Sequence, residues 1–325
     1  MGSPTKVPLN GLATALNGRV DVFICSASFE ARCMSVPDQL PPESIGAVLV
    51  CANANFPDVL SGNGRYLSDR YGDKGSLVKL STENPLITAD ALQNALSRFA
   101  SDVPINYVID ITTFTHEALL ILLKIMRLRL AAKDTATLVY SSAAEYSVGD
   151  KPEDKWLSKG IGEIRSVLGY PGKIVPTRKL HLVILTGFEC ERADRLIEEY
   201  EPNRISLGVG DPAHSISADH YSVNKANHAK IAAKYADVLE FEFSCSDPAA
   251  AMAAIESHIA EIADHNVLIA PMNTKISTIG AGLLALKNES IQLCYATAHQ
   301  YNEAKYSTPG ADCYVFDFPP QFRNP

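Results

Sequence analysis

The feature that most restricts how this chain can fold is an internal repeat. Three segments of the first half return in the second half in the same order: residues 21–30 as 181–189, residues 106–115 as 266–275, and residues 138–146 as 293–301. The offset between equivalent positions stays between 155 and 160 residues, as for Phe29 and Phe188 or Tyr140 and Tyr295. A nearly constant offset across three separate matches predicts two copies of one structural module.

Each copy has the pattern of an open α/β sheet. Its apolar runs are short and unalternating, which is typical of parallel strands covered on both faces. The predicted strands are residues 20–25, 47–51, 76–80, 106–111 and 137–140 in the first copy, and 180–185, 204–207, 238–243, 266–269 and 291–295 in the second. Apolar residues at helical spacing occupy 89–99, 115–130, 248–262 and 277–286. We therefore predict an α/β protein of two tandem Rossmann-like modules, each a mostly parallel sheet flanked by helices.

The repeat also gives expected domain boundaries. Residues 1–146 form the predicted first module and residues 180–325 the predicted second module. The segment 147–179 between them is rich in Gly, Pro, Lys and Asp and is predicted to be a linker with a helix over 155–168. Because no strand precedes it, Gly160-Ile-Gly162 is not interpreted as a dinucleotide-binding fingerprint.

Composition excludes several classes of function. The 325 residues include 29 Lys and Arg against 37 Asp and Glu, a net charge of −8, with no basic run. General binding of duplex DNA or of an anionic membrane is therefore not expected, whereas a local pocket for one phosphorylated ligand is compatible. The longest apolar run stops at Lys124, too short to span a bilayer, and the N-terminus lacks the pattern of a secretory signal. Seven cysteines without a CxxC pair are typical of buried thiols in a reducing compartment, so we expect a cytoplasmic protein.

Polar residues gather after the first strand of each copy, at the strand ends where open parallel sheets bind ligands. These turns contain hydroxyl groups, an acid and an arginine: Ser26, Ser28, Glu30 and Arg32 in the first copy, and Thr186, Glu189 and Arg192 in the second. A turn of this kind presents helix-start N–H groups to an anion. The structural alternative is an acid in the first helical turn, favoured by the helix dipole and paired with the arginine.

The turns after the fourth strands carry a second set of candidates. They are Asp110, Thr112, Thr113 and Thr115 in the first copy, and Asn273, Thr274 and Lys275 in the second. An acid at the position of Asp110 is suited to binding ribose hydroxyls. Lys275 at a helix start opposes the helix dipole, which predicts a compensating anion. Ordinary helix capping by the threonines is the alternative.

Tyr140 and Tyr295 follow the last predicted strands and are candidates for stacking on a base, with packing at the module rim as the alternative. His214, His220 and His228 share one polar stretch, but their spacing fits no zinc pattern. No metal site and no cofactor is therefore predicted, and no recognised nucleophile or phosphate-loop motif occurs.

One short motif resembles a known family. The stretch from Ala270 to Gly280, Ala-Pro-Met-Asn-Thr-Lys-Ile-Ser-Thr-Ile-Gly, resembles the Thr-Lys turn and glycine-bearing helix of CARF domains, and the duplication resembles SAVED domains, which are like two fused CARF modules. The resemblance implies a sensor of a cyclic oligonucleotide or related phosphorylated ligand in prokaryotic antiviral defence, with a separate effector protein as partner. The first copy departs from the motif, with Thr113-Phe-Thr115 where the second has Asn273-Thr-Lys275.

Two other classes stay open. The run from Asp21 to Ser28 is similar to the opening strand of TIR domains, which implies a nucleotide or NAD glycosidic-bond hydrolase with Glu30 or Asp110 as the catalytic carboxylate. The replacement of Asp110 by Ala270 in the second copy favours a ligand-binding module without catalysis. A structural scaffold subunit of a larger complex is the third class.

Overall fold

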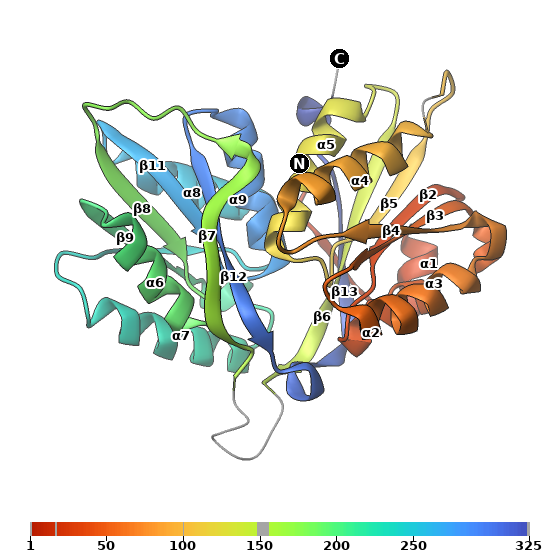
Figure 1. Cartoon of the computed structure of the whole chain (residues 1–325), viewed down its shortest axis with the longest axis horizontal. Coiled ribbons are helices and arrows are strands. Elements are labelled where there is room, and N and C mark those ends of the chain that lie inside the picture. Colours follow the sequence, from red (N-terminus) through yellow and green to blue (C-terminus); the bar gives the residue numbers. More distant parts are fainter. Residues whose placement is uncertain (1, 17, 100, 148–155, 324–325) are drawn as a thin grey trace. The chain divides into compact units, whose positions relative to one another are not determined.

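The computed structural model describes residues 2–16, 18–99, 101–147 and 156–323. The chain divides into two compact units (Figure 1). The first unit contains Met1–Val148 together with Ser307–Pro325, and the second contains Gly149–Tyr306. Each unit is built around one sheet.

The first unit has a seven-stranded sheet in the order β1-β13-β6-β5-β2-β3-β4. Its strands are β1 (Thr5–Pro8), β2 (Val20–Ser26), β3 (Ile45–Asn53), β4 (Gly75–Leu80), β5 (Asn106–Asp110), β6 (Thr135–Tyr146) and β13 (Ser307–Asp317). Strands β2 to β6 are parallel to one another, and β13 is antiparallel to both β6 and β1.

The second unit has a six-stranded sheet in the order β10-β9-β8-β11-β12-β7. Its strands are β7 (Ser158–Pro171), β8 (Lys179–Leu185), β9 (Arg204–Gly210), β10 (Leu239–Phe243), β11 (His265–Pro271) and β12 (Gln292–Tyr301). Five strands are parallel, and β7 runs antiparallel beside β12. In both units the parallel strands are thus ordered third, second, first, fourth, fifth, with an antiparallel strand beside the fifth. This confirms the predicted fold class and the duplication.

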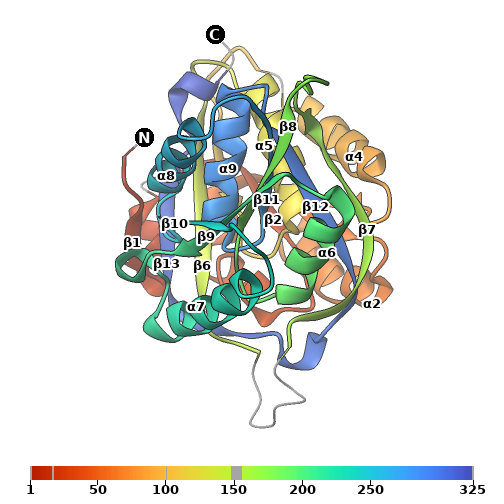
Figure 2. The ribbon, with the colours of Figure 1, turned by 90° about the vertical axis from the view of Figure 1, so that its left-hand side faces the viewer.

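Helices cover both faces of each sheet. The longer ones are α4 (Pro85–Ser97) and α5 (His116–Arg129) in the first unit, and α6 (Cys190–Tyr200), α7 (Ala218–Ala232), α8 (Pro248–Ala260) and α9 (Lys275–Lys287) in the second. Right-handed crossovers place α6 and α7 on one face and α8 and α9 on the other, because the strand order reverses after β10 (Figure 2). The short helices α1 (Leu12–Ala15), α2 (Pro57–Val59) and α3 (Arg65–Arg70) belong to the first unit. None of the described helices is long and apolar enough to cross a membrane.

Central strands and buried helices follow the apolar pattern of the sequence. Phe23 and Ile24 of β2 are fully buried, as are Leu182 and Val183 of β8, which explains why these strands show no polar alternation. Asn84, Thr115, Asp247 and Thr274 cap α4, α5, α8 and α9 by accepting hydrogen bonds from backbone N–H groups of the first helical turn.

The predicted linker helix over 155–168 is wrong. Residues 148–155 of that linker lie outside the described residues, and Ser158–Pro171 is strand β7. Gly160 has a φ of +67°, and a Cβ on Gly162 would lie 2.4 Å from Thr297 Oγ1 of the neighbouring strand. Two glycines disfavour a helix and permit this close approach between strands.

The predicted boundaries are corrected by an exchange of strands. Strand β7 follows β6 in the sequence but pairs with β12, while β13 follows β12 but pairs with β6. The second unit therefore gains 158–171, and the last 19 residues, Ser307–Pro325, belong to the first unit instead of the second. Each sheet receives its antiparallel strand from the segment that follows the other sheet.

Candidate functional site

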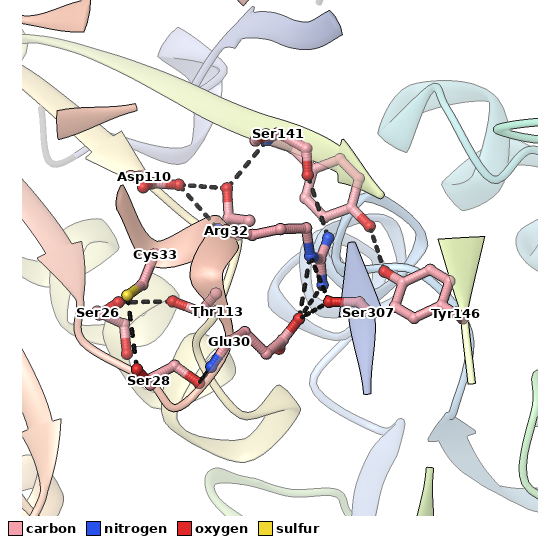
Figure 3. A network of polar contacts seen from close by, with 12 residues as sticks. Ser26, Ser28, Glu30, Arg32, Cys33, Asp110, Thr113, Ser141, Tyr146 and Ser307 are labelled. Carbon is pink, nitrogen blue, oxygen red and sulfur yellow. Dashed lines mark hydrogen bonds and ion pairs between the residues drawn. The ribbon is translucent and has the colours of Figure 1, made fainter. Parts of the chain in front are cut away.

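Polar side chains form a connected network at the carboxyl ends of β2, β5 and β6 (Figure 3). Arg32 lies at its centre and is 2% exposed. Its guanidinium makes two hydrogen bonds to Glu30 Oε2, of 3.0 Å from Nε and 2.6 Å from Nη2, and a third from Nη1 to the carbonyl of Ser141 (3.2 Å). Ser307, the first residue of β13, donates to the same Glu30 oxygen at 2.6 Å.

Two tyrosines of β6 complete this first network. The ring of Tyr146 lies under the Arg32 guanidinium, with 5.0 Å between the carbon and the ring centroid. The hydroxyls of Tyr140 and Tyr146 are 3.2 Å apart. An arginine held by a carboxylate, a serine and an aromatic face is fixed in position by the protein itself.

The second unit contains an equivalent network. Arg192 is 7% exposed and its Nη2 lies 3.3 Å from Glu189 Oε2 and 3.0 Å from Ser158 Oγ. Ser158 is the first residue of β7 and also donates to Glu189 Oε1. The Arg192 guanidinium lies 6.0 Å from the ring centroid of Tyr295, and Tyr301 pairs with Ser158 in the sheet.

The two networks match member by member. The equivalent residues are Glu30 and Glu189, Arg32 and Arg192, Tyr140 and Tyr295, Tyr146 and Tyr301, and Ser307 and Ser158. The structure thus brings the predicted Glu, Arg and Tyr residues together within each module. It adds the serines of the exchanged strands and the second tyrosines, whose roles could not be read from the sequence because they depend on strand pairing.

The structural alternative is wrong in placing both acids in a first helical turn, and it is confirmed in pairing each acid with its arginine. Glu30 precedes a short 3₁₀ turn (Ala31–Met34) and Glu189 precedes α6, and neither side chain caps its helix. The first module has a 3₁₀ turn where the second has an α-helix, so the arginine follows its acid by two residues in one and by three in the other. Both arginines nevertheless reach the carboxylate.

The turn after the first strand is anchored from two sides in each module. In the first, Thr113 Oγ1 donates to the Ser26 carbonyl (2.5 Å) and Asn63 Nδ2 to the Ser28 carbonyl (2.7 Å). Ser28 Oγ also accepts from the backbone N–H of Glu30 at 3.2 Å. The predicted candidates Ser26, Ser28 and Thr113 therefore shape the turn, and Asn63 was missed by the sequence analysis.

The second module has the corresponding anchors. Asn273 Nδ2 donates to the Thr186 carbonyl (2.5 Å), and Asn227 Nδ2 donates to the Phe188 carbonyl (3.0 Å). A Cβ on Gly187 would lie 2.2 Å from the Met272 carbonyl oxygen, so glycine is needed for close approach of the two turns. The turn after the first strand is thus hydrogen-bonded from two sides in the second module as well.

Asp110 lies at the carboxyl end of β5 and is 1% exposed. Thr112 donates to its Oδ1 through both the backbone N–H (3.0 Å) and the hydroxyl, and Thr112 Oγ1 in turn accepts from the N–H of Ser141 at 2.9 Å. Burial raises the pKa of Asp110 to about 7, against the lowering effect of the Thr112 hydrogen bonds. Among the described residues, no donor or acceptor pairs with its buried Oδ2.

The turns after the fourth strands end in equivalent helix caps. Thr115 Oγ1 accepts from the N–H of Ala118 at 3.2 Å, and Thr274 Oγ1 accepts from the N–H of Ser277 at 3.1 Å. Lys275 is therefore the first residue of α9, and the equivalent first residue of α5 is His116. The capping alternative holds for both threonines, and the predicted position of Lys275 in a first helical turn is confirmed.

The histidine-rich stretch makes local contacts. His228 Nδ1 lies 3.1 Å from Thr186 Oγ1 and its Nε2 lies 2.7 Å from Glu240 Oε2. The ring of His220 packs edge-on against Phe188 at 5.8 Å, and His214 pairs with Asp211. Within the described part of the chain, no three His, Cys, Asp or Glu side chains are grouped as a metal site.

No protein-family model and no curated protein sequence matches this chain at a significant level. Among solved structures, it is similar to the cytoplasmic domain of a prokaryotic cation chloride cotransporter, with 11% identity over 88% of this chain and 99% of that chain and a TM-score of 0.26. It is also similar to a functionally unknown protein from Pseudomonas aeruginosa (7% identity, 86% and 93% covered, TM-score 0.27). A protein from the same species described as a universal stress protein gives 8% identity, 86% and 94% coverage and a TM-score of 0.25. At these values the likenesses carry no argument, and the assignment of two tandem Rossmann-like modules follows from the strand orders.

Proposed function

We propose that this chain binds a phosphorylated, nucleotide-type ligand and acts as a sensor without catalysis. The observation that carries the proposal is the duplicated Glu-Arg-Tyr-Tyr-Ser network at the carboxyl ends of the strands. In sheets with this strand order, ligands bind beyond the carboxyl ends of the strands, near the first and fourth strands, where the strand order reverses.

The energetics of the network favour a role in binding. A buried ion pair contributes little net stability compared with apolar residues of similar volume, because both ions lose their hydration. Two modules that differ in most other residues nevertheless both keep a buried arginine with a carboxylate, a serine and tyrosines. Guanidinium groups bind phosphate with paired hydrogen bonds, and aromatic rings stack on bases. Of the four tyrosines, only the half-buried Tyr146 and Tyr301 are accessible for stacking, because Tyr140 and Tyr295 are buried.

The resemblance to CARF and SAVED domains gives the finer proposal. The turn Asn273-Thr274-Lys275 carries that resemblance, and by it the ligand is a cyclic oligonucleotide, the setting is prokaryotic antiviral defence, and a separate effector protein receives the signal. Seven free cysteines support action in a reducing compartment such as the cytoplasm.

Calorimetric titration tests the proposed function. Probes are 5′-AMP, NAD and cyclic oligoadenylates, each added to the full chain, to Arg192→Gln and to the matched control Arg195→Gln. Arg195 lies one turn further along α6 and is half exposed beside Glu198, so both variants remove one positive charge from the same helix. We expect binding of at least one probe, weakened at least tenfold by the first variant and unchanged by the second. Absence of binding to all three probes would favour a scaffold subunit.

Asp110 supports a second candidate function, a nucleotide or NAD glycosidic-bond hydrolase. A carboxyl with a pKa of about 7 at a strand end has the property expected of a general acid. Glu30 is the weaker candidate because Arg32 and Ser307 already occupy its carboxylate. Incubation of the protein with NAD separates the two functions: release of nicotinamide that is lost in Asp110→Asn supports hydrolysis, and unchanged NAD supports sensing.

A further inference from the structure

The segment that joins β12 to β13 contacts both arginine networks. In the second unit, Tyr301 pairs with Ser158 in the sheet, and Ser158 Oγ accepts a 3.0 Å hydrogen bond from Arg192. Ser307 contacts Arg32 and Glu30 at 3.2 and 2.6 Å, within the first unit. Tyr306, whose ring lies beside that of Tyr301, is joined to Ser307 of the first network by one peptide bond.

This connection is held firmly on the side of the second unit. The N–H of Asn302 donates to the Leu157 carbonyl and its Nδ2 to the Trp156 carbonyl, both at 2.9 Å. Tyr301 pairs with Ser158 in the sheet, and Ser158 is the serine of the second network. The rings of Tyr301 and Tyr306 lie 6.2 Å apart. The segment that leads to Ser307 is thus hydrogen-bonded beside Ser158.

We infer that the segment Tyr301–Ser307 couples the two networks, so that a change at Arg32 alters the state of Arg192 and the reverse. An anion that draws the Arg32 guanidinium away from Glu30 also removes a partner of Ser307, which starts β13. A role of this coupling in ligand sensing rests on the proposed function. The segment that connects the two networks is present in the protein without any ligand. A coupling free energy acts equally in both directions.

Amide hydrogen exchange of the ligand-free full chain tests the coupling. Ser307→Ala removes the hydroxyl that joins Glu30 and Arg32, and Ser307→Thr keeps a hydroxyl. Thr308→Ala is the matched control, because consecutive residues of a strand direct their side chains to opposite faces of the sheet, and Thr308 follows Ser307 in β13. We expect Ser307→Ala to raise exchange about tenfold at the start of α6, around Arg192, as expected for loss of a hydrogen bond to a charged group. Ser307→Thr should restore the slow exchange, and Thr308→Ala should leave it unchanged.

Two further readouts complete the test. Trp156 is the single tryptophan, so its fluorescence reports on the segment that binds Asn302 and should shift in Ser307→Ala alone. In the reverse direction, Glu189→Gln should raise exchange at 31–35 in the first unit. Changes confined to the unit that carries the substitution would overturn the coupling. Because no ligand is added, failure of 5′-AMP, NAD and cyclic oligoadenylates to bind would refute the proposed function separately and leave this comparison valid.

Discussion

Ser307 donates a 2.6 Å hydrogen bond to the carboxylate of Glu30, although 277 positions separate the two residues in the sequence. The contact exists because β13 pairs antiparallel with β6 in the sheet that contains β2. The first network is therefore complete only when the C-terminal strand has joined the N-terminal unit.

Removal of Ser307–Pro325 should destabilise the first unit and spare the second. The deletion exposes the edge of β6 and takes away the buried side chains of Phe316 and Phe318. Hydrogen exchange should rise throughout 20–146 and stay slow in β8 and β11. Loss of protection in the second unit alone would contradict the strand exchange.

Glu30→Gln should lower the free energy of unfolding by about 3 kcal/mol, because it leaves the buried Arg32 without its counter-charge. Glu256→Gln, which breaks an exposed pair with Lys287, is the matched control and should change it by no more than about 0.5 kcal/mol. Urea unfolding of both variants measures the difference. Equal effects would show that the ion pair of the first network is not buried.

Asp110→Asn should stabilise the protein at pH 8 and have little effect at pH 4. The folded-state pKa of Asp110, about 7, lies above the unfolded value of 3.8, so the protonated carboxyl favours the folded state. The free energy of unfolding therefore falls as the pH rises between these values. The uncharged amide introduced by Asp110→Asn removes the cost of burying an ionised carboxylate, which is at most about 4 kcal/mol at high pH. Thermal melts across this range check the sign, with the exposed Asp73→Asn as control. Stabilisation by Asp110→Asn that does not depend on pH would contradict a buried acid at this position.

The second unit should lose stability as the pH falls from about 6.5 to 4. His181 and His258 both lie 2.7 Å from Ser206 Oγ, and burial lowers the pKa of His181 to about 4, from 6.5, and lowers that of His258 as well. As the pH falls, the unfolded chain binds these protons before the folded chain does. For His181 this lowers the free energy of unfolding by about 3 kcal/mol between about pH 6.5 and pH 4. His181→Leu should flatten the pH dependence of urea unfolding in this range. An unchanged slope would show that His181 takes up its proton equally in the folded state.

The repeat made the fold predictable, because strand cores such as 20–25 and 180–185 keep their apolar runs in both copies. The turn residues Glu30, Arg32, Glu189 and Arg192 were also found, since the duplication marks them by position. Ser158 and Ser307 could not be found, because their roles depend on strands that pair with the other module. The helix expected over 155–168 was wrong for the same reason, because this segment pairs with β12 and its Ile161 and Ile164 pack on the core of the second unit.

The nitrogen-proton spectrum of the arginine Nε–H groups tests the central claim most directly, because it reports on Arg32 and Arg192 themselves. The full chain is titrated with the nucleotide that calorimetry shows to bind, and the signals are assigned with Arg32→Lys, Arg192→Lys and Arg195→Lys. A ligand bound at the duplicated network should shift the signals of Arg32 and Arg192 in proportion to occupancy and leave that of Arg195 in place. Saturation of the protein with neither buried arginine signal moving would contradict the assignment of these networks as the ligand site.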